Sequence, residues 1–158
     1  LDVDYTPASH AWIPGQRSSP YEMGLGWTVN LGKQGYFVGR RALELEHREG
    51  SSWQLAGLEI DWEGLEREYA AVGMPPQVPA SAVRGSIPVY AGPRQAGYAS
   101  TSTWSPVLKK YIALVHLQQP FYAPGTQVEI EVTVEHHRRK SPAKVVALPF
   151  YDPEWKKK

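Results

Sequence analysis

The sequence predicts a mainly β domain with short helices, in which six or seven strands form a closed or nearly closed antiparallel barrel. Three observations predict this class. The 14 glycines and 14 prolines make about 18% of the 158 residues, against an average of about 12%, and they divide the chain into short elements. Short apolar runs alternate with turn residues in the second half. Residues Gln127–Val134 alternate apolar and polar side chains without error, as a half-buried strand does.

The first part of the chain predicts two short extended pieces with a helical turn between them. Leu1–Tyr5 is expected to be extended. Ser19 and Glu22 have the spacing of a capping box, and the helix that they open must be brief because Gly24 follows within a turn. Residues Trp27–Leu31 alternate with a period of two, so we expect a strand there.

Two helices flank the next predicted strand. Arg40–Glu49 is expected to form a helix that ends at Gly50, with a solvated face of opposite charges four residues apart. Trp53–Ile60 is strand-like. Asp61 can cap a second helix, because apolar residues then recur at helical spacing. These residues are Trp62, Leu65, Tyr69 and Val72. Three prolines in Met74–Ala80 predict an extended connector.

The remaining residues predict strands joined by turns. The expected strands are Ser86–Tyr90, Gln95–Trp104, Tyr111–Leu117, Gln127–Val134 and Ala143–Leu148. Pro88 cannot donate a ladder hydrogen bond, which favours an edge position for its strand. Ser105 opens a short turn of helix that runs to Lys110, and His136–Lys140 is expected to be a polar turn.

Composition and motifs exclude several classes of function. The chain has no cysteine, so it has no disulfide, thiolate metal site or cysteine nucleophile. Its net charge of +1 gives no long-range attraction to nucleic acid or to an anionic membrane. No apolar run approaches the roughly 18 residues of a membrane span. The nucleophile elbow, the P-loop and the helical zinc motif are also absent.

From the residues alone, no group of side chains predicts a catalytic centre. His136 and His137 are neighbours that would point to opposite faces of a strand, so a solvated turn is favoured over a metal site. His116 lies in an apolar strand and is expected to be a core or edge histidine. Asp2 and Asp4 share a face of an extended piece, where exposure is favoured over a carboxylate pair.

Six stretches in the same order together carry a resemblance to a known family. They are Ser19–Val29, Gly35–Leu43, Leu55–Leu58, Gly97–Leu114, Pro124–Ile130 and Ala143–Phe150. These stretches resemble the carboxyl-terminal part of the aminomethyltransferase family, which includes the T-protein of the glycine cleavage system. The resemblance implies a six-stranded Greek-key antiparallel barrel over residues 51–158, within a mainly β fold with short helices. It also implies that residues 1–50 are the end of a folate-binding domain with its connecting helix.

The resemblance implies a function in one-carbon metabolism. The family transfers a one-carbon unit to tetrahydrofolate, which lies in a channel between domains. The main catalytic aspartate and a pterin-binding glutamate of the family lie upstream of the part that this chain resembles. We therefore expect the carboxyl-terminal segment of a longer cytoplasmic transferase, with no catalytic residue of its own and inactive alone. The expected partners are folate, a methyl or aminomethyl donor and a lipoyl-carrier protein, with no nucleic acid or membrane.

Three residues are implied as folate-binding candidates. Lys33 precedes the Gly35–Leu43 stretch, where the family has a basic residue that contacts folate, and the alternative is a solvated loop lysine. Trp155 follows the last matching stretch, where an aromatic residue lines the pocket, with Tyr151 as the other candidate and a disordered tail as the alternative. Trp104 either faces the channel or packs in the core.

One departure from the family pattern leaves other functions open. Residues Glu63–Ser86 add a helix and a proline-rich connector where a shorter link is expected. The insertion suits folate-dependent O-demethylases of methoxyaromatic compounds, methylamine-type oxidoreductases with a related tail, or less typical relatives. A non-catalytic folate-binding relative, of the kind that assists iron–sulfur maintenance, is a further alternative. So is a stand-alone barrel that binds RNA or protein, although the +1 charge argues against RNA.

Overall fold

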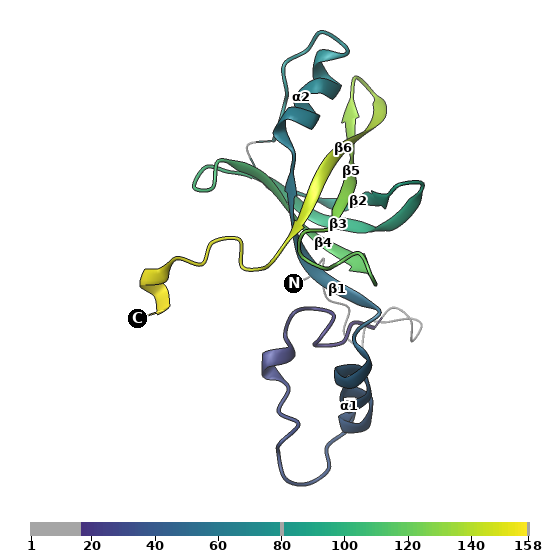
Figure 1. The fold of residues 1–158 in the computed structure, drawn as a ribbon, viewed down its shortest axis with the longest axis vertical. Coiled ribbons are helices and arrows are strands. Elements are labelled where there is room, and N and C mark those ends of the chain that lie inside the picture. The colour runs from purple at the N-terminus through teal and green to yellow at the C-terminus, as the bar shows by residue number, and fades with distance from the viewer. Residues whose placement is uncertain (1–16, 80, 158) are drawn as a thin grey trace.

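The protein consists of a barrel with helical structure at its two ends (Figure 1). The structure, a computed structural model, describes residues 17–79 and 81–157. The expected extended piece Leu1–Tyr5 and the Asp2 and Asp4 pair lie outside the described residues. Helix α2 covers one end of the barrel, and residues 17–50 with helix α1 lie at the opposite end (Figure 1). Among the described residues, no helix has the length and apolar character to cross a membrane.

Six antiparallel strands close into the barrel. They are β1 (Trp53–Ile60), β2 (Val83–Ala91), β3 (Arg94–Ser105), β4 (Lys110–Gln118), β5 (Gln127–Val134) and β6 (His137–Val146). Their order around the barrel is β1-β4-β3-β2-β5-β6, in which β4 returns beside β1 as in a Greek key. The sheet closes where β6 pairs with β1, from Gly57 opposite Val146 to Ile60 opposite Ala143. The predicted closed six-stranded antiparallel barrel is therefore confirmed.

The alternation of side chains along the strands builds the core. On β5, Val128, Ile130 and Val134 are buried inside the barrel, whereas the intervening glutamates point outward. Aliphatic side chains from all six strands, from alanine to leucine and isoleucine, fill the interior. The fully buried members include Leu58, Val89, Ala96, Ala99, Val115, Leu117 and Val145. His116 on β4, expected as a core or edge histidine, is 5% exposed, and its ring stacks on that of Tyr98 with ring centroids 5.2 Å apart.

Both longer helices form where the sequence predicts them. Helix α1 (Arg40–Glu49) ends at Gly50, whose φ of 83° favours glycine. Helix α2 (Trp62–Ala70) is capped by Asp61, whose carboxylate accepts a hydrogen bond from the Gly64 N–H at 3.1 Å. Leu65 of α2 is 2% exposed, because it packs over the barrel end.

The strand predicted at Trp27–Leu31 is wrong. Residues Gly26–Thr28 form a short 3₁₀ helix, η2, and the chain continues as a loop. The Thr28 hydroxyl donates to the Leu25 carbonyl at 2.7 Å, which stabilises the turn locally. Five alternating residues do not make a strand without a partner backbone to pair with. The predicted capping box does form between Ser19 and Glu22, but these residues belong to a turn and not to a helix.

Two predicted connections differ in detail. The turn expected over His136–Lys140 is only Glu135 and His136, whose φ values are 47° and 64°, and His137 already begins β6. The helical turn expected from Ser105 is a non-helical turn, in which the Leu108 N–H donates to the Ser105 hydroxyl at 3.3 Å. The returning strand ends at Val146 rather than at residue 148.

Pro88 keeps part of the edge character that the sequence predicts, although a closed barrel has no free edge. It lies opposite Tyr98 of β3 on one side of β2. On the other side, β2 pairs with β5 only through Val89 and Tyr90. The barrel therefore tolerates a proline here because the backbone of Pro88 has no ladder partner on β5.

Candidate functional site

The loop that carries Lys33 lies between η2 and α1 and is organised by one guanidinium group. Arg40 donates from Nη1 to the carbonyl oxygens of Lys33, at 2.9 Å, and Gly35, at 2.8 Å. Its Nη2 donates to the Leu31 carbonyl at 3.0 Å. At the start of the loop, the Asn30 Oδ1 accepts from the Gly32 N–H at 3.0 Å. These contacts curl the backbone around Arg40 and leave Lys33 exposed.

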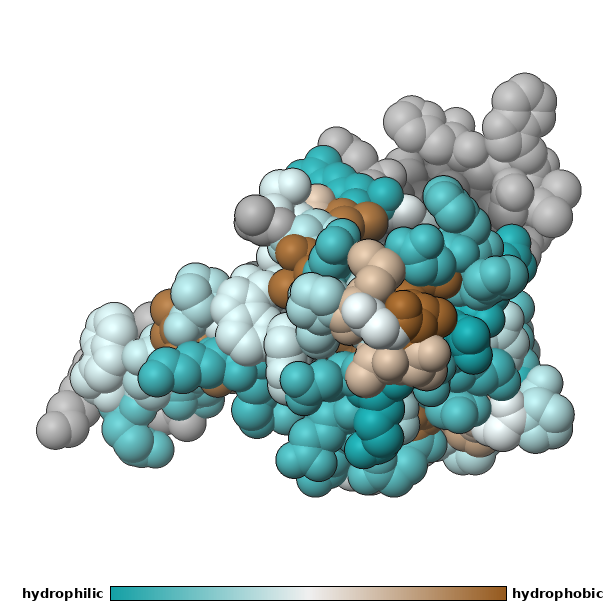
Figure 2. Space-filling view, turned by 90° about the horizontal axis from the view of Figure 1, so that it is seen from above, coloured by the Kyte–Doolittle hydropathy of each residue, from teal (hydrophilic) through white to brown (hydrophobic). Residues whose placement is uncertain are grey.

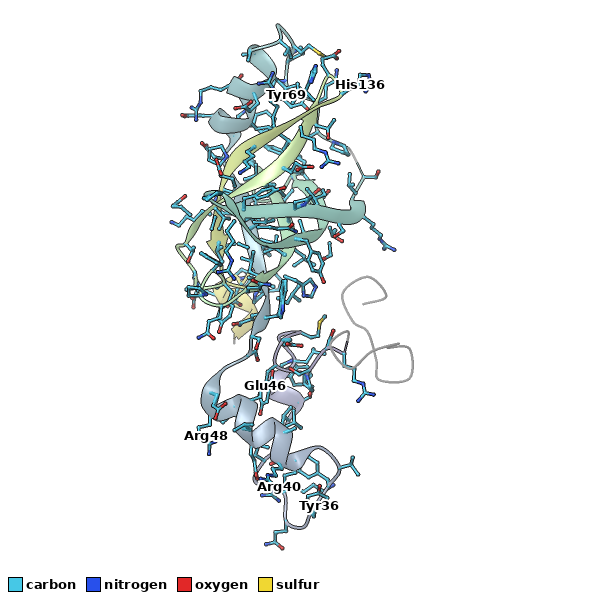
Figure 3. All side chains as sticks on the ribbon, turned by 90° about the vertical axis from the view of Figure 1, so that its right-hand side faces the viewer. Tyr36, Arg40, Glu46, Arg48, Tyr69 and His136 are labelled. Carbon is cyan, nitrogen blue, oxygen red and sulfur yellow. The ribbon has the colours of Figure 1, made fainter. Side chains whose placement is uncertain are left out.

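Arg40 is itself fixed by two neighbours. Its Nε donates to Glu44 Oε1 at 2.8 Å, one helical turn further along α1. Its guanidinium carbon lies 5.8 Å from the centre of the Phe37 ring, on the ring face. Figure 3 shows Arg40 beside Tyr36 at the end of the molecule farthest from α2. The sequence indicates the Arg40–Glu44 pair through its spacing, but no sequence signal indicates the three carbonyl contacts.

Trp104 lies at the other end of the barrel, on β3. Its indole meets the Trp62 indole edge to face, with ring centroids 5.2 Å apart. Trp62 is the first residue of α2, so Trp104 helps to hold that helix on the barrel. A groove of about 400 Å³ beside this pair is lined by Trp62 and by charged side chains of both signs, among them Glu59, Asp61, Lys109, Lys110 and Lys144.

Trp155 lies in the carboxyl-terminal segment, which leaves the barrel to one side (Figure 1). It belongs to a short 3₁₀ helix, η3 (Glu154–Lys157), and it is 67% exposed. Tyr151, the other aromatic candidate, is 47% exposed. Both rings therefore keep a large exposed area.

The structure does not bring the three candidate residues together. Trp104 contacts the start of α2, whereas Lys33 contacts Arg40 at the opposite end of the barrel (Figures 1 and 3). Within residues 17–79 and 81–157, no group of three or more metal-ligating side chains gathers. His136 and His137 are both exposed at the β5–β6 hairpin. A folate site that uses all three candidates would need further protein surface between them.

A second groove, of about 360 Å³, lies between α2 with its connector and the barrel end. Tyr69, Val78, Ser102, Tyr111 and Glu131 are among its lining residues. Ser102 and Tyr111 share a hydrogen bond of 3.2 Å between their hydroxyls. The sequence does not indicate this groove, because its lining comes from the connector and four different strands. Figure 2, which looks onto the α2 end, shows a mostly hydrophilic surface with a small apolar group at its centre.

One outward-facing cluster changes the acidity of a tyrosine. Partial desolvation and then the neighbouring Glu131 carboxylate raise the pKa of Tyr90, while Arg138 acts in the opposite direction. The Tyr90 hydroxyl donates to Glu131 Oε2 at 3.3 Å. The ammonium group of Lys140 lies 4.1 Å from the centre of the Tyr90 ring. This cluster joins β2, β5 and β6 on the outside of the barrel, and its Glu131 also lines the groove of about 360 Å³.

Apolar side chains are unusually exposed between residues 26 and 45. Trp27 is 83% exposed, Tyr36 81% and Val38 95%. Helix α1 has no buried residue, although Leu45 is one of its side chains. We call these four residues the exposed apolar set. Four large exposed apolar side chains within 20 residues are more than the single ones that a protein surface usually carries.

Comparison with known proteins identifies the family. Residues 67–152 match the family described as the glycine cleavage T-protein C-terminal barrel domain. The chain is 32% identical over 134 residues to an aminomethyltransferase of Prochlorococcus marinus (strain NATL2A), covering 85% of this chain and 30% of that protein. It is 32% identical over 133 residues to an aminomethyltransferase of Bacillus pumilus (strain SAFR-032), covering 84% of this chain and 31% of that protein.

A solved structure shares the fold. It is the crystal structure of glycine cleavage system aminomethyltransferase T from Bartonella henselae, which matches with a TM-score of 0.61 and 18% identity. The match covers 84% of this chain and 32% of that one. The chain thus spans about 30% of the length of the curated relatives that it matches. Since the family match covers more than half of the 158 residues, the chain belongs to the glycine cleavage T-protein C-terminal barrel domain family.

Proposed function

We propose that this chain is the carboxyl-terminal segment of a tetrahydrofolate-dependent aminomethyl or methyl transferase and that it closes the folate site. Membership of the T-protein barrel family supports this proposal, as do relatives that are named aminomethyltransferases and are about three times as long. In this proposal residues 1–50 end the folate-binding domain, and residues 51–158 form the closing barrel domain. The segment alone is inactive, because the catalytic groups lie in the upstream part.

The observation that carries the proposal is the exposed apolar set. A ten-residue helix is marginal in water on its own, and α1 gains no stability from a buried side chain in this chain. Trp27, Tyr36 and Val38 would together remove a large apolar area from water if another surface covered them. The upstream two-thirds of a full-length enzyme is the surface that we propose to lie there.

The folate contacts follow from the chemistry of the candidate residues. Lys33 presents an exposed ammonium group, which suits a carboxylate of the glutamate part of tetrahydrofolate. The exposed Trp155 ring suits contact with a flat heteroaromatic ring. Trp104 contributes indirectly, through α2, when the upstream part is present. The other proposed partners are the one-carbon donor and a lipoyl-carrier protein, in the cytoplasm.

A second candidate differs only in the donor. Helix α2 and the connector enclose the groove of about 360 Å³ at the barrel end. A groove at this position that binds the donor favours a folate-dependent O-demethylase. Its donor would be a methoxyaromatic compound in place of the aminomethyl-lipoyl carrier. The two candidates predict the same folate site and different donors, so one assay with both donors separates them.

The test uses the full-length protein, the 158-residue chain and one pair of matched variants. Calorimetric titration with tetrahydrofolate should give binding to the full-length protein and at least a hundredfold weaker binding to the chain alone. Lys33→Ala should weaken binding about tenfold, which is the effect of one charge-assisted hydrogen bond. Arg41→Ala, the control, removes an exposed charge from α1 nearby and should leave the affinity unchanged.

Two results would count against the proposal. If the full-length protein does not bind tetrahydrofolate, the proposed function is wrong. If Lys33→Ala and Arg41→Ala bind as well as the unchanged protein, Lys33 does not belong to the site. Transfer of a one-carbon unit to tetrahydrofolate from an aminomethyl-lipoyl carrier or a methoxyaromatic compound then identifies the donor.

A further inference from the structure

We propose that Arg40 is a positioning residue that fixes the Lys33 loop in the conformation that receives folate. This inference rests on the proposed function, because it assigns to Arg40 a role that acts through Lys33. Its basis is one guanidinium group that binds three carbonyl oxygens of a single loop, those of Leu31, Lys33 and Gly35. Arg40 itself touches no ligand in this proposal.

The three contacts determine the backbone on both sides of Lys33. The Lys33 carbonyl is held directly at 2.9 Å, and the carbonyls two residues before and two residues after it are held at 3.0 Å and 2.8 Å. Because all three carbonyls are held by one planar group, the loop cannot rotate one peptide without losing a charge-assisted hydrogen bond. The Lys33 side chain is exposed, so the held backbone sets the starting point from which its ammonium group reaches outward.

The guanidinium is a fixed anchor because it is tied to helix α1. Its Nε donates to Glu44 at 2.8 Å, and its plane is covered by the Phe37 ring at 5.8 Å. The Arg40 side chain is 28% exposed, which is less than the 48% of Glu44. Arg40 therefore attaches the loop to helix α1, and its guanidinium group is mostly shielded from solvent. A lysine at this position could not reproduce the contacts, because a single ammonium lacks the planar fork of donors.

Little else holds the loop among the described residues. Residues 32–36 are all exposed, so no apolar side chain anchors them. Asn30 holds only the first part of the loop: its Oδ1 accepts from the Gly32 N–H at 3.0 Å, and its carbonyl oxygen accepts from the Lys33 N–H at 3.4 Å. Gly35 has a φ of 85°, and glycine adopts many other backbone conformations when nothing restrains it. Without Arg40 the loop would sample many conformations, and folate would have to order it on binding, at a cost in affinity.

The decisive experiment is a double-mutant cycle in the full-length protein with tetrahydrofolate as the probe. Arg40→Lys keeps the charge and removes the fork, and we expect it to raise the Kd about five- to tenfold. In a Lys33→Ala background the same substitution should change the Kd by less than about twofold, because Arg40 acts through Lys33. Arg41→Lys, the matched control on the next residue, should leave the Kd unchanged in both backgrounds.

A second measurement follows the loop without any ligand. Amide hydrogen exchange at residues 31–35 should become faster in Arg40→Lys than in Arg41→Lys, while exchange in the barrel strands stays the same. A merely structural role for Arg40 would lower the unfolding midpoint and weaken folate binding equally in both backgrounds. That result would overturn the inference, as would an unchanged Kd in Arg40→Lys.

Failure of the inference and failure of the proposed function give different results. Full-length protein that does not bind tetrahydrofolate contradicts the proposed function, and the inference is then wrong with it. Protein that binds tetrahydrofolate, loses affinity in Lys33→Ala and keeps it in Arg40→Lys contradicts the inference alone. If Lys33→Ala and Arg40→Lys each weaken tetrahydrofolate binding and the double variant weakens it no further, both the proposed function and the inference are supported.

Discussion

The indole of Trp62 meets the indole of Trp104 edge to face, with ring centroids 5.2 Å apart and ring planes inclined at 63°. This contact attaches the first residue of α2 to the barrel strand β3. Trp62→Ala should therefore lower the free energy of unfolding by about 2 kcal/mol, from the lost aromatic pair and the lost apolar burial. Urea unfolding of the 158-residue chain measures it.

The control for this substitution is Trp27→Ala, because Trp27 is 83% exposed in the chain. Its removal should change the free energy of unfolding by no more than about 0.5 kcal/mol. Equal losses for the two tryptophans would mean that the contact with Trp104 does not hold α2.

A methyl group at Gly97 would break the pairing between β3 and β4. Its Cβ would overlap the carbonyl oxygen of His116 and lie 3.0 Å from the Leu117 Cα, and these are backbone atoms of β4 that cannot move aside. Gly97→Ala should cost more than about 3 kcal/mol of unfolding free energy. Thermal unfolding followed by far-ultraviolet circular dichroism should reveal an unfolded or strongly destabilised chain.

Gly85→Ala is the matched control on strand β2. A Cβ at Gly85 would meet no atom within 4 Å. The free energy of unfolding should stay unchanged or rise by up to about 1 kcal/mol, because alanine restricts the unfolded chain. No loss at Gly97 would contradict the close pairing of β3 with β4, and a loss at Gly85 as large as that at Gly97 would mean that the overlap with β4 is not the cause.

The carboxylate of Asp61 should stabilise the start of α2. Asp61→Ala leaves the Gly64 N–H without its acceptor, and it should cost about 1 kcal/mol of unfolding free energy. Asp61→Asn keeps an acceptor oxygen and should cost less than half as much. Faster amide exchange at Gly64 in the alanine variant alone would locate the effect at the cap, whereas equal exchange in both variants would rule the cap out.

The raised pKa of Tyr90 predicts a pH dependence in the alkaline range. Because the folded state holds the phenolic proton more tightly than the unfolded chain, this contribution to stability is present below about pH 10. It is lost as the pH rises through the folded pKa of Tyr90. Glu131→Gln should bring the pKa down, since it removes the negative charge beside the phenol.

Nuclear magnetic resonance of the tyrosine ring carbons checks this prediction, with Tyr90→Phe to assign the signal. The Tyr90 signal should titrate at a higher pH in the unchanged protein than in Glu131→Gln. The same midpoint in both proteins would show that the carboxylate has no part in the shift.

Side-chain periodicity predicted most of the strands because the barrel buries one face of each. Gln127–Val134 alternates strictly, and it became β5 with the predicted bounds. The same rule failed at Trp27–Leu31, where the alternation is real but no neighbouring strand pairs with it. Alternation indicates that one face of a segment is apolar, but it does not indicate a neighbouring strand to pair with. A short loop with alternating residues is therefore predicted as a strand.

Turn length was harder to predict because it depends on backbone conformation. The polar run after Val134 suggested a five-residue turn, yet Glu135 and His136 with positive φ complete it in two. The charged residues that follow are strand residues on an exposed hairpin, paired with Glu131–Val134. Charge alone therefore does not distinguish a solvated turn from the solvated end of a strand.

The candidate site residues could be predicted from the sequence only through its resemblance to the aminomethyltransferase family. Lys33, Trp104 and Trp155 have no shared pattern, and the structure places them in a loop, on a strand and in a terminal segment. The hydrogen bonds that make the Lys33 loop distinctive come from Arg40, seven residues away. Such contacts arise from three-dimensional folding of the loop, so a linear pattern cannot contain them.

Helix α2 and its connector, which link β1 to β2, lie at the barrel end opposite to the Lys33 loop (Figure 1). Between the two ends stands a continuous circuit of hydrogen-bonded strands whose register is set by their own pairing. Lengthening or shortening the chain after Ile60 therefore leaves the geometry around Arg40 untouched. The barrel thus separates its two ends, so the length and chemistry of the α2 end and the loop around Arg40 are structurally independent.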